Sequence, residues 1–205
     1  MTDANYNKQL VLVNAAIPLV WLGYDAFTGG LGANPIEFFL RATGVLGLIF
    51  LLITLSITPL RRLTGRNDLI KVRRSLGLIA FAYVCIHLTT YFVFDRGADL
   101  GSMLGDVAER PFITVGMAGF VMLVPLAVTS TNGMIKRLGG KRWQRLHRLI
   151  YLIAIAGVVH YYMLVKSDIS YPLMFGAVLV LLLLSRAFLT RPGKPKSEAR
   201  AVSIQ

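Results

Sequence analysis

The chain has 205 residues, of which 55% are hydrophobic and 16% are charged. Its mean hydropathy of +0.63 is too high for an ordinary soluble domain of this length, so the sequence predicts an all-α integral membrane protein. The formal net charge is +12. Because the basic residues fall in short connections between apolar runs, this charge indicates membrane topology, and we expect a lipid bilayer and no nucleic acid as the surroundings.

Six apolar runs are long enough to cross a bilayer as helices. The first is the weakest, because Asn14 and Pro18 interrupt it. The runs form one predicted transmembrane domain, residues 10–189, between an N-terminal segment 1–9 and a polar tail 190–205 that we expect to be disordered. In chain order, the six runs are 10–27, 38–60, 72–94, 112–130, 143–165 and 171–189.

The charges of the connections predict the orientation of this six-helix bundle. The connections after the second and the fourth run are strongly basic, and the tail adds further lysines and arginines. The other connections carry most of the acidic residues. The positive-inside rule therefore places both basic connections and both chain ends in the cytoplasm, as expected for a multi-pass protein of a bacterial inner membrane.

All three histidines lie in apolar runs, His87 in the third and His147 and His160 in the fifth. An ionisable side chain at membrane depth is costly, which makes each one a candidate functional residue. Both runs are predicted to lead outward, so His87 and His160 each lie about 20 Å along their helices, at a shared level. Two neutral imidazoles that face each other across a bundle are typical axial ligands of haem b iron.

His147 lies near the inner face, where no histidine stands opposite it. It is a candidate for a third haem ligand or for a residue at the electron entry. The thirteen residues to His160 turn through about 1300° on an ideal helix, which leaves the two side chains about 140° apart unless the helix bends, for example near Gly157. The alternative for each histidine is an ordinary interhelical hydrogen bond or, for His147, contact with headgroups and water.

Arginines gather at the inner ends of the same two runs. Arg73 and Arg74 open the third run, and Arg142, Arg145 and Arg148 flank His147 at the inner edge of the fifth. These side chains suit contact with haem propionates, a flavin phosphate or an anionic donor, although membrane anchoring explains them equally well. The chain has no GxGxxG motif after a strand and no P-loop, so we expect a separate cytoplasmic protein or a membrane quinol to supply electrons.

Two features are predicted at the outer face. Arg41, near the start of the second run, can extend to the membrane surface or meet a haem propionate. The connection 95–111 carries four acidic residues and is expected to be a solvated loop, with partner docking as the alternative.

An ordered set of motifs along nearly the whole chain resembles the MsrQ family, formerly YedZ, within the ferric-reductase-like transmembrane superfamily. The motifs are GGLGANP (29–35), TPLRR (58–62), VRRSLGLIAFAYVCIHLTTY (72–91), RPFITVG (110–116), PLAVTS (125–130) and LGGKRWQRLHRLIYL (138–152). The resemblance implies haem b ligands at His87, His147 and His160. It also implies an FMN, with Arg73 and Arg74 near the cytoplasmic electron entry.

The resemblance further implies a role as a transmembrane electron carrier. Electrons from the quinol pool or a cytoplasmic flavin reductase would pass through haem to a periplasmic molybdopterin protein, MsrP, which reduces methionine sulfoxide in oxidised proteins. This chain would do no sulfoxide chemistry itself. It has three of the four histidines that ligate two haems in the larger ferric reductases and NADPH oxidases, so the number of haems stays open.

Three alternatives to this role also stay open. The first is a cytochrome b membrane anchor of another quinol-linked complex, and the second is a ferric reductase that acts alone. The third is a proton-coupled transporter whose histidines relay protons.

Overall fold

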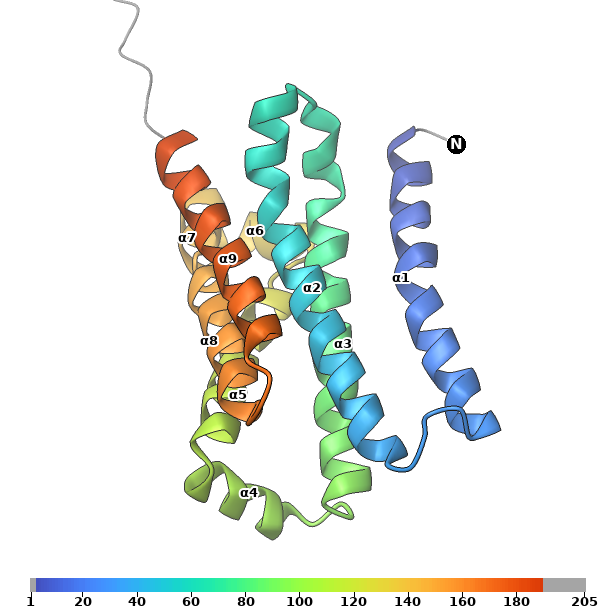
Figure 1. Ribbon diagram of the computed structural model, residues 1–205. Coiled ribbons are helices and arrows are strands. Elements are labelled where there is room, and N and C mark those ends of the chain that lie inside the picture. Colours follow the sequence, from blue (N-terminus) through green and yellow to red (C-terminus); the bar gives the residue numbers. More distant parts are fainter. Residues whose placement is uncertain (1–2, 190–205) are drawn as a thin grey trace, which may run out of the picture.

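The computed structural model describes residues 3–189, and within this range every regular element is a helix (Figure 1). Six stretches are long and apolar enough to cross a membrane, which confirms the all-α class and the six predicted runs. The predicted disordered tail, 190–205, lies outside the described residues. The long helices are α1 (Asp3–Thr28), α2 (Pro35–Thr64), α3 (Arg73–Thr90), α5 (Pro111–Val128), α8 (Leu149–Leu164) and α9 (Ser170–Leu189), and the short elements are η1 (Asn67–Lys71), η2 (Tyr91–Asp95), α4 (Leu100–Glu109), α6 (Asn132–Leu138) and α7 (Gly140–Leu146).

Five of the long helices share one apolar core, and α1 packs at its side. The core contains Leu55 of α2, Ala80 of α3, Leu126 of α5 and Ala154 of α8, all buried, together with α9 residues. Helix α2 packs mainly along α3, and α5 packs mainly along α8. Helix α1 contacts α3, where the Tyr83 hydroxyl donates a hydrogen bond of 2.6 Å to a backbone carbonyl of α1. The bundle thus consists of two antiparallel helix pairs, with α9 packed against both.

The structure corrects two predictions. The connection 95–111 is largely the helix α4, and not a loop: Asp99 accepts a hydrogen bond from Gly101 N–H at 2.9 Å and so caps the helix start. The fifth run, 143–165, is not one helix. It breaks at His147 and Arg148, where Arg148 N–H bonds to the Arg145 carbonyl three residues back, whereas α8 continues through Gly157 without a break.

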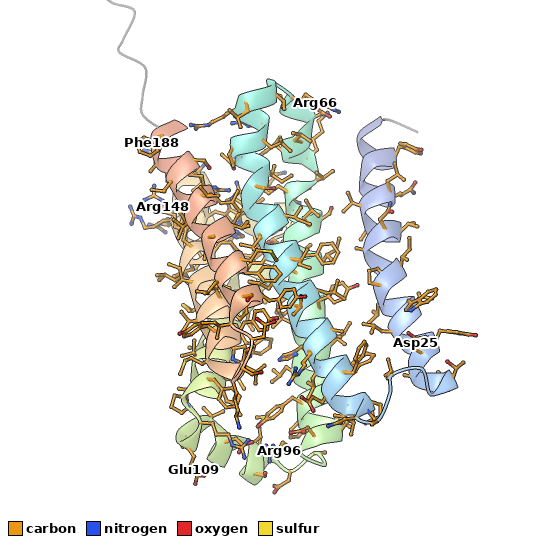
Figure 2. The ribbon with its side chains drawn as sticks, in the orientation of Figure 1. Asp25, Arg66, Arg96, Glu109, Arg148 and Phe188 are labelled. Atoms are coloured by element: carbon orange, nitrogen blue, oxygen red, sulfur yellow. The ribbon has the colours of Figure 1, made fainter. Side chains whose placement is uncertain are left out.

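The charged connections lie at opposite ends of the bundle. The described chain begins and ends at the end that holds the α2–α3 connection (Figure 1). Figure 2 shows Arg66 and Arg148 toward that end, and Asp25, Arg96 and Glu109 toward the other. We call these the basic end and the acidic end. Helix α2 is longer than predicted and ends at Thr64, with Gly65 in a left-handed conformation (φ 70°).

Helix α2 contains a proline in its buried face, and a buried arginine compensates for it. Pro59 has no N–H, so the Leu55 carbonyl lacks its helical partner. The Arg186 side chain of α9 donates to this carbonyl from Nη2 at 2.7 Å and from Nε at 3.2 Å. Its Nη1 also donates to the Tyr151 hydroxyl at 2.7 Å. One side chain thereby joins α2, α8 and α9.

Replacing Arg186 with leucine is expected to lower the free energy of unfolding by about 1–3 kcal/mol, because buried acceptors lose their donors. In a Pro59→Ala background the loss should be smaller, because the restored N–H at position 59 can bond to the Leu55 carbonyl. A double-mutant cycle on unfolding in detergent micelles measures this coupling. Equal losses in the two backgrounds would contradict the assignment.

Candidate functional site

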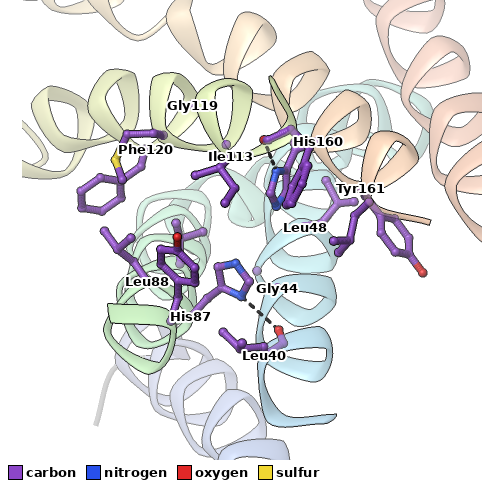
Figure 3. Close-up of a pocket in the computed structure, with 18 of the residues that line it drawn as sticks. Leu40, Gly44, Leu48, His87, Leu88, Ile113, Gly119, Phe120, His160 and Tyr161 are labelled. Atoms are coloured by element: carbon purple, nitrogen blue, oxygen red, sulfur yellow. Dashed lines mark hydrogen bonds between the residues drawn. The ribbon is translucent and has the colours of Figure 1, made fainter. Parts of the chain in front are cut away.

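Two of the three histidines face each other inside the bundle. His87 comes from α3 and His160 from α8, with ring centres 6.3 Å apart and ring planes at 84° (Figure 3). Two imidazole nitrogens on opposite sides of one metal ion, each at about 2 Å, would put the ring centres about 6 Å apart. The observed separation therefore leaves room for a single iron between the rings.

A backbone carbonyl behind each ring determines which nitrogen carries the proton. His87 Nδ1 lies 3.0 Å from the Leu40 carbonyl oxygen, and His160 Nδ1 lies 2.6 Å from the Phe112 carbonyl oxygen. A carbonyl only accepts hydrogen bonds, so Nδ1 donates and the other ring nitrogen, Nε2, keeps its lone pair. This is the tautomer that ligates a metal through Nε2, and such a support also orients the ring.

Two glycines make these contacts possible. A Cβ atom on Gly44 of α2 would lie 3.1 Å from His87 Nδ1, and one on Gly116 of α5 would lie 2.8 Å from His160 Nδ1. Each glycine follows the accepting residue, Leu40 or Phe112, by four positions. The two helix pairs therefore present their histidines by the same local arrangement. Small residues are common where helices meet in membranes, and this is the signal in the sequence that could have identified these two positions.

The histidines line a cavity of about 340 Å³ between α2, α3, α5 and α8, within the range of small-molecule and cofactor sites. Its walls are mostly apolar. Five of its lining residues are glycines, which leave room beside the helices for a flat ligand; they are Gly44, Gly47, Gly116, Gly119 and Gly157. The cavity and its two imidazoles thus fit a planar, largely apolar cofactor held by its metal, as haem b is.

His147 occupies a different place. Its ring stacks on Trp143, with ring centres 3.8 Å apart, and its Nε2 lies 3.2 Å from the Thr129 hydroxyl. The Trp143 indole N–H donates to the Thr129 carbonyl at 2.9 Å. His147 does not line the cavity that holds the other two histidines. The structure therefore separates it from the pair, at the junction of α7 and α8.

The predicted arginines divide into two groups. Arg73 is half-buried at the start of α3, where its charge acts on His147. Arg74 is exposed and donates a hydrogen bond of 2.7 Å to the Asn132 side chain of α6. The other three predicted arginines, Arg142, Arg145 and Arg148, are all exposed. Of these arginines, only Arg73 thus shares a partly buried environment with His147.

Comparison with known proteins identifies the family. Residues 42–158 match the family described as ferric reductase like transmembrane component. A protein of Herminiimonas arsenicoxydans is 52% identical over 95% of this chain and 90% of its own length. A protein of Rhodospirillum rubrum is 53% identical, with 86% and 85% covered, and one of Caulobacter vibrioides is 48% identical, with 92% and 90% covered.

Each of these three relatives is named as the heme-binding subunit MsrQ of a protein-methionine-sulfoxide reductase. Their similarity extends over nearly the whole chain, as the sequence motifs do. The family resemblance is thereby confirmed: this chain belongs to the MsrQ family of the ferric-reductase-like transmembrane proteins.

Proposed function

We propose that this chain binds haem b between His87 and His160 and carries electrons across a bacterial inner membrane. The observation that carries the proposal is the 6.3 Å separation of the two rings, together with the carbonyl behind each Nδ1. The names of the relatives, which include heme binding, support the same choice of ligand. When bound, haem supplies a metal centre that accepts and releases one electron at a time.

The protein contributes binding, orientation and exclusion of water. His87 and His160 would hold the iron through their Nε2 atoms, and the carbonyls of Leu40 and Phe112 keep both imidazoles in the ligating tautomer. The apolar walls shield the centre, and the chemistry on sulfoxide falls to a partner. Within the described residues, no cluster of three or more potential ligand side chains is arranged for a separate metal ion.

The direction of transfer follows from the charges at the two ends. We place the basic end, with both chain termini, in the cytoplasm, because lysines and arginines favour that side. The acidic end then faces the periplasm, and the charged residues that line the cavity of the histidine pair lie at this end. Electrons would leave there for a periplasmic molybdopterin reductase of the MsrP type, in keeping with the reductase named for the relatives.

Electrons would enter at the basic end, from the quinol pool or from a cytoplasmic flavin reductase. We assign His147 and Arg73 to this entry, because they lie together, partly buried, at the inner ends of α8 and α3. An FMN is proposed here on the family resemblance, with Arg73 and Arg74 as the candidate partners of its phosphate. The exposed Arg142, Arg145 and Arg148 suit contact with the donor protein.

The histidine assignment predicts a simple pattern in absorption spectra. His87→Ala and His160→Ala should each abolish the low-spin b-type spectrum, because each removes an axial ligand, whereas His147→Ala should retain it. Reduced-minus-oxidised spectra of purified protein, with haem counted as the pyridine haemochrome, measure this. Full low-spin haem in His87→Ala would contradict ligation of one haem by His87 and His160. A colourless wild-type protein after haem-sufficient expression would favour a proton relay.

The electron-entry assignment predicts a kinetic defect. Replacing Arg73 and Arg74 together with alanine should slow reduction by a flavin reductase or quinol at least several-fold and leave the haem content intact. Arg137→Ala, which removes an exposed charge on α6 at the same end, is the matched control. Stopped-flow reduction at the haem band is the measurement. Unchanged rates of haem reduction in the double variant would indicate that these arginines serve only to anchor the helix at the membrane surface.

A further inference from the structure

The cavity between the histidines has one charged end. Its charged lining residues all come from three neighbouring places: the first turns of α2, the connection from η2 to α4, and the residue that caps α5. The remaining walls are apolar apart from the two histidines and two tyrosines. The charged lining residues are Glu37, Arg41, Asp95, Arg96 and Arg110.

A buried carboxylate organises two of these arginines. Asp106 of α4 is only 7% exposed. Arg96 Nε lies 2.7 Å from its Oδ2, and Arg110 Nε lies 3.0 Å from its Oδ1. The Tyr91 hydroxyl donates a short hydrogen bond to the same carboxylate. Asp106 itself does not line the cavity, so it stands behind the two guanidinium groups and holds them in place.

Both guanidinium groups keep donors for a second anion. Each approaches Asp106 most closely through Nε, and a guanidinium has five N–H donors in a rigid plane. The Arg96 contact is too oblique for a hydrogen bond, although the distance is short, so it is an ion pair. Arg96 also lies 3.3 Å from Asp95. Asp95 and Asp106 together balance the two positive charges, so the arginines suit a further negative group through the N–H donors that these contacts leave over.

We propose that Arg96 and Arg110, held by Asp106 and Tyr91, bind the two propionates of the haem. This inference rests on the haem site proposed above. Carboxylates in a membrane protein need charged partners, and guanidinium groups pair with them well. The propionate edge of the macrocycle would then face α4 and the acidic end, which is the side of electron exit.

Arg41 is less suited to this role. It forms an ion pair of 2.6 Å with the exposed Glu37, whereas Arg96 and Arg110 pair with the buried Asp106. The Arg41 side chain is 66% exposed, against 22% for Arg96 and 48% for Arg110. We therefore assign the propionate contact to Arg96 and Arg110, which lie on either side of α4, and not to Arg41, for which the sequence suggested it. Because positive charge beside the macrocycle favours the added electron, the pair should also raise the reduction potential.

The test uses the purified full-length protein with haem whose propionate carboxyl groups carry ¹³C. Arg96→Gln and Arg110→Gln are compared with Lys166→Gln, which removes an exposed charge from the α8–α9 connection outside the cavity. Haem content, midpoint potential and the label-sensitive bands in redox-difference infrared spectra are measured. Both arginine variants should show a lower potential and shifted labelled bands, and Lys166→Gln should show neither.

Wild-type potential and wild-type labelled bands in both arginine variants would overturn the propionate assignment and leave the haem site itself standing. If the glutamine variants fail to accumulate haem, the propionate contact is tested instead with Arg96→Lys and Arg110→Lys. These variants keep the positive charge but change the geometry of its N–H donors. Shifted labelled bands at full haem content then support the assignment, and unshifted bands overturn it. A wild-type protein without low-spin haem would instead overturn the proposed function.

Discussion

The hydrogen bond from a backbone carbonyl to each imidazole Nδ1 is the constraint on which the site depends. It fixes the tautomer, aims Nε2 into the cavity and ties α3 to α2 and α8 to α5. A Cβ atom on Gly116 would collide with the His160 ring, and one on Gly44 would crowd the His87 ring. A change in either helix pair would therefore move one of the two imidazoles.

Buried polar groups elsewhere in the bundle are also paired with groups of the protein itself. Polar atoms in a membrane need internal partners. Arg186 supplies the donor that Pro59 removes from α2, and Asp106 is buried only with two arginines and a tyrosine around it. One network joins helices toward the basic end of the bundle, and the other supplies two arginines that line the cavity at its acidic end. In the proposed orientation, the first lies toward the electron entry and the second at the exit.

Much of the architecture could be predicted from the sequence, because long apolar runs and their charged flanks respond directly to the bilayer. The shared depth of His87 and His160 needed only the helical rise and the direction of each run. The break at His147 and the helix α4 could not be predicted in this way, since both depend on local capping and tertiary contacts. The spacing of Leu100, Met103, Leu104 and Val107 was the available signal for α4.

The contact between Gly116 and the His160 ring and the clustering of charged residues around Asp106 were harder still to predict from the sequence. Both arise from residues distant in the sequence that only the packed bundle brings together. Asp106 and its two arginines looked like the charges of a solvated connection, because sequence alone does not reveal which carboxylate becomes buried.

Electron paramagnetic resonance of the oxidised protein can show whether His87 and His160 ligate the haem iron. The two imidazole planes meet at 84°, and nearly perpendicular axial imidazoles leave the orbitals of low-spin ferric iron almost degenerate. We expect a highly anisotropic low-spin signal dominated by one large g value. A high-spin ferric signal, or the rhombic low-spin signal of parallel imidazoles, would contradict ligation by His87 and His160 in this arrangement.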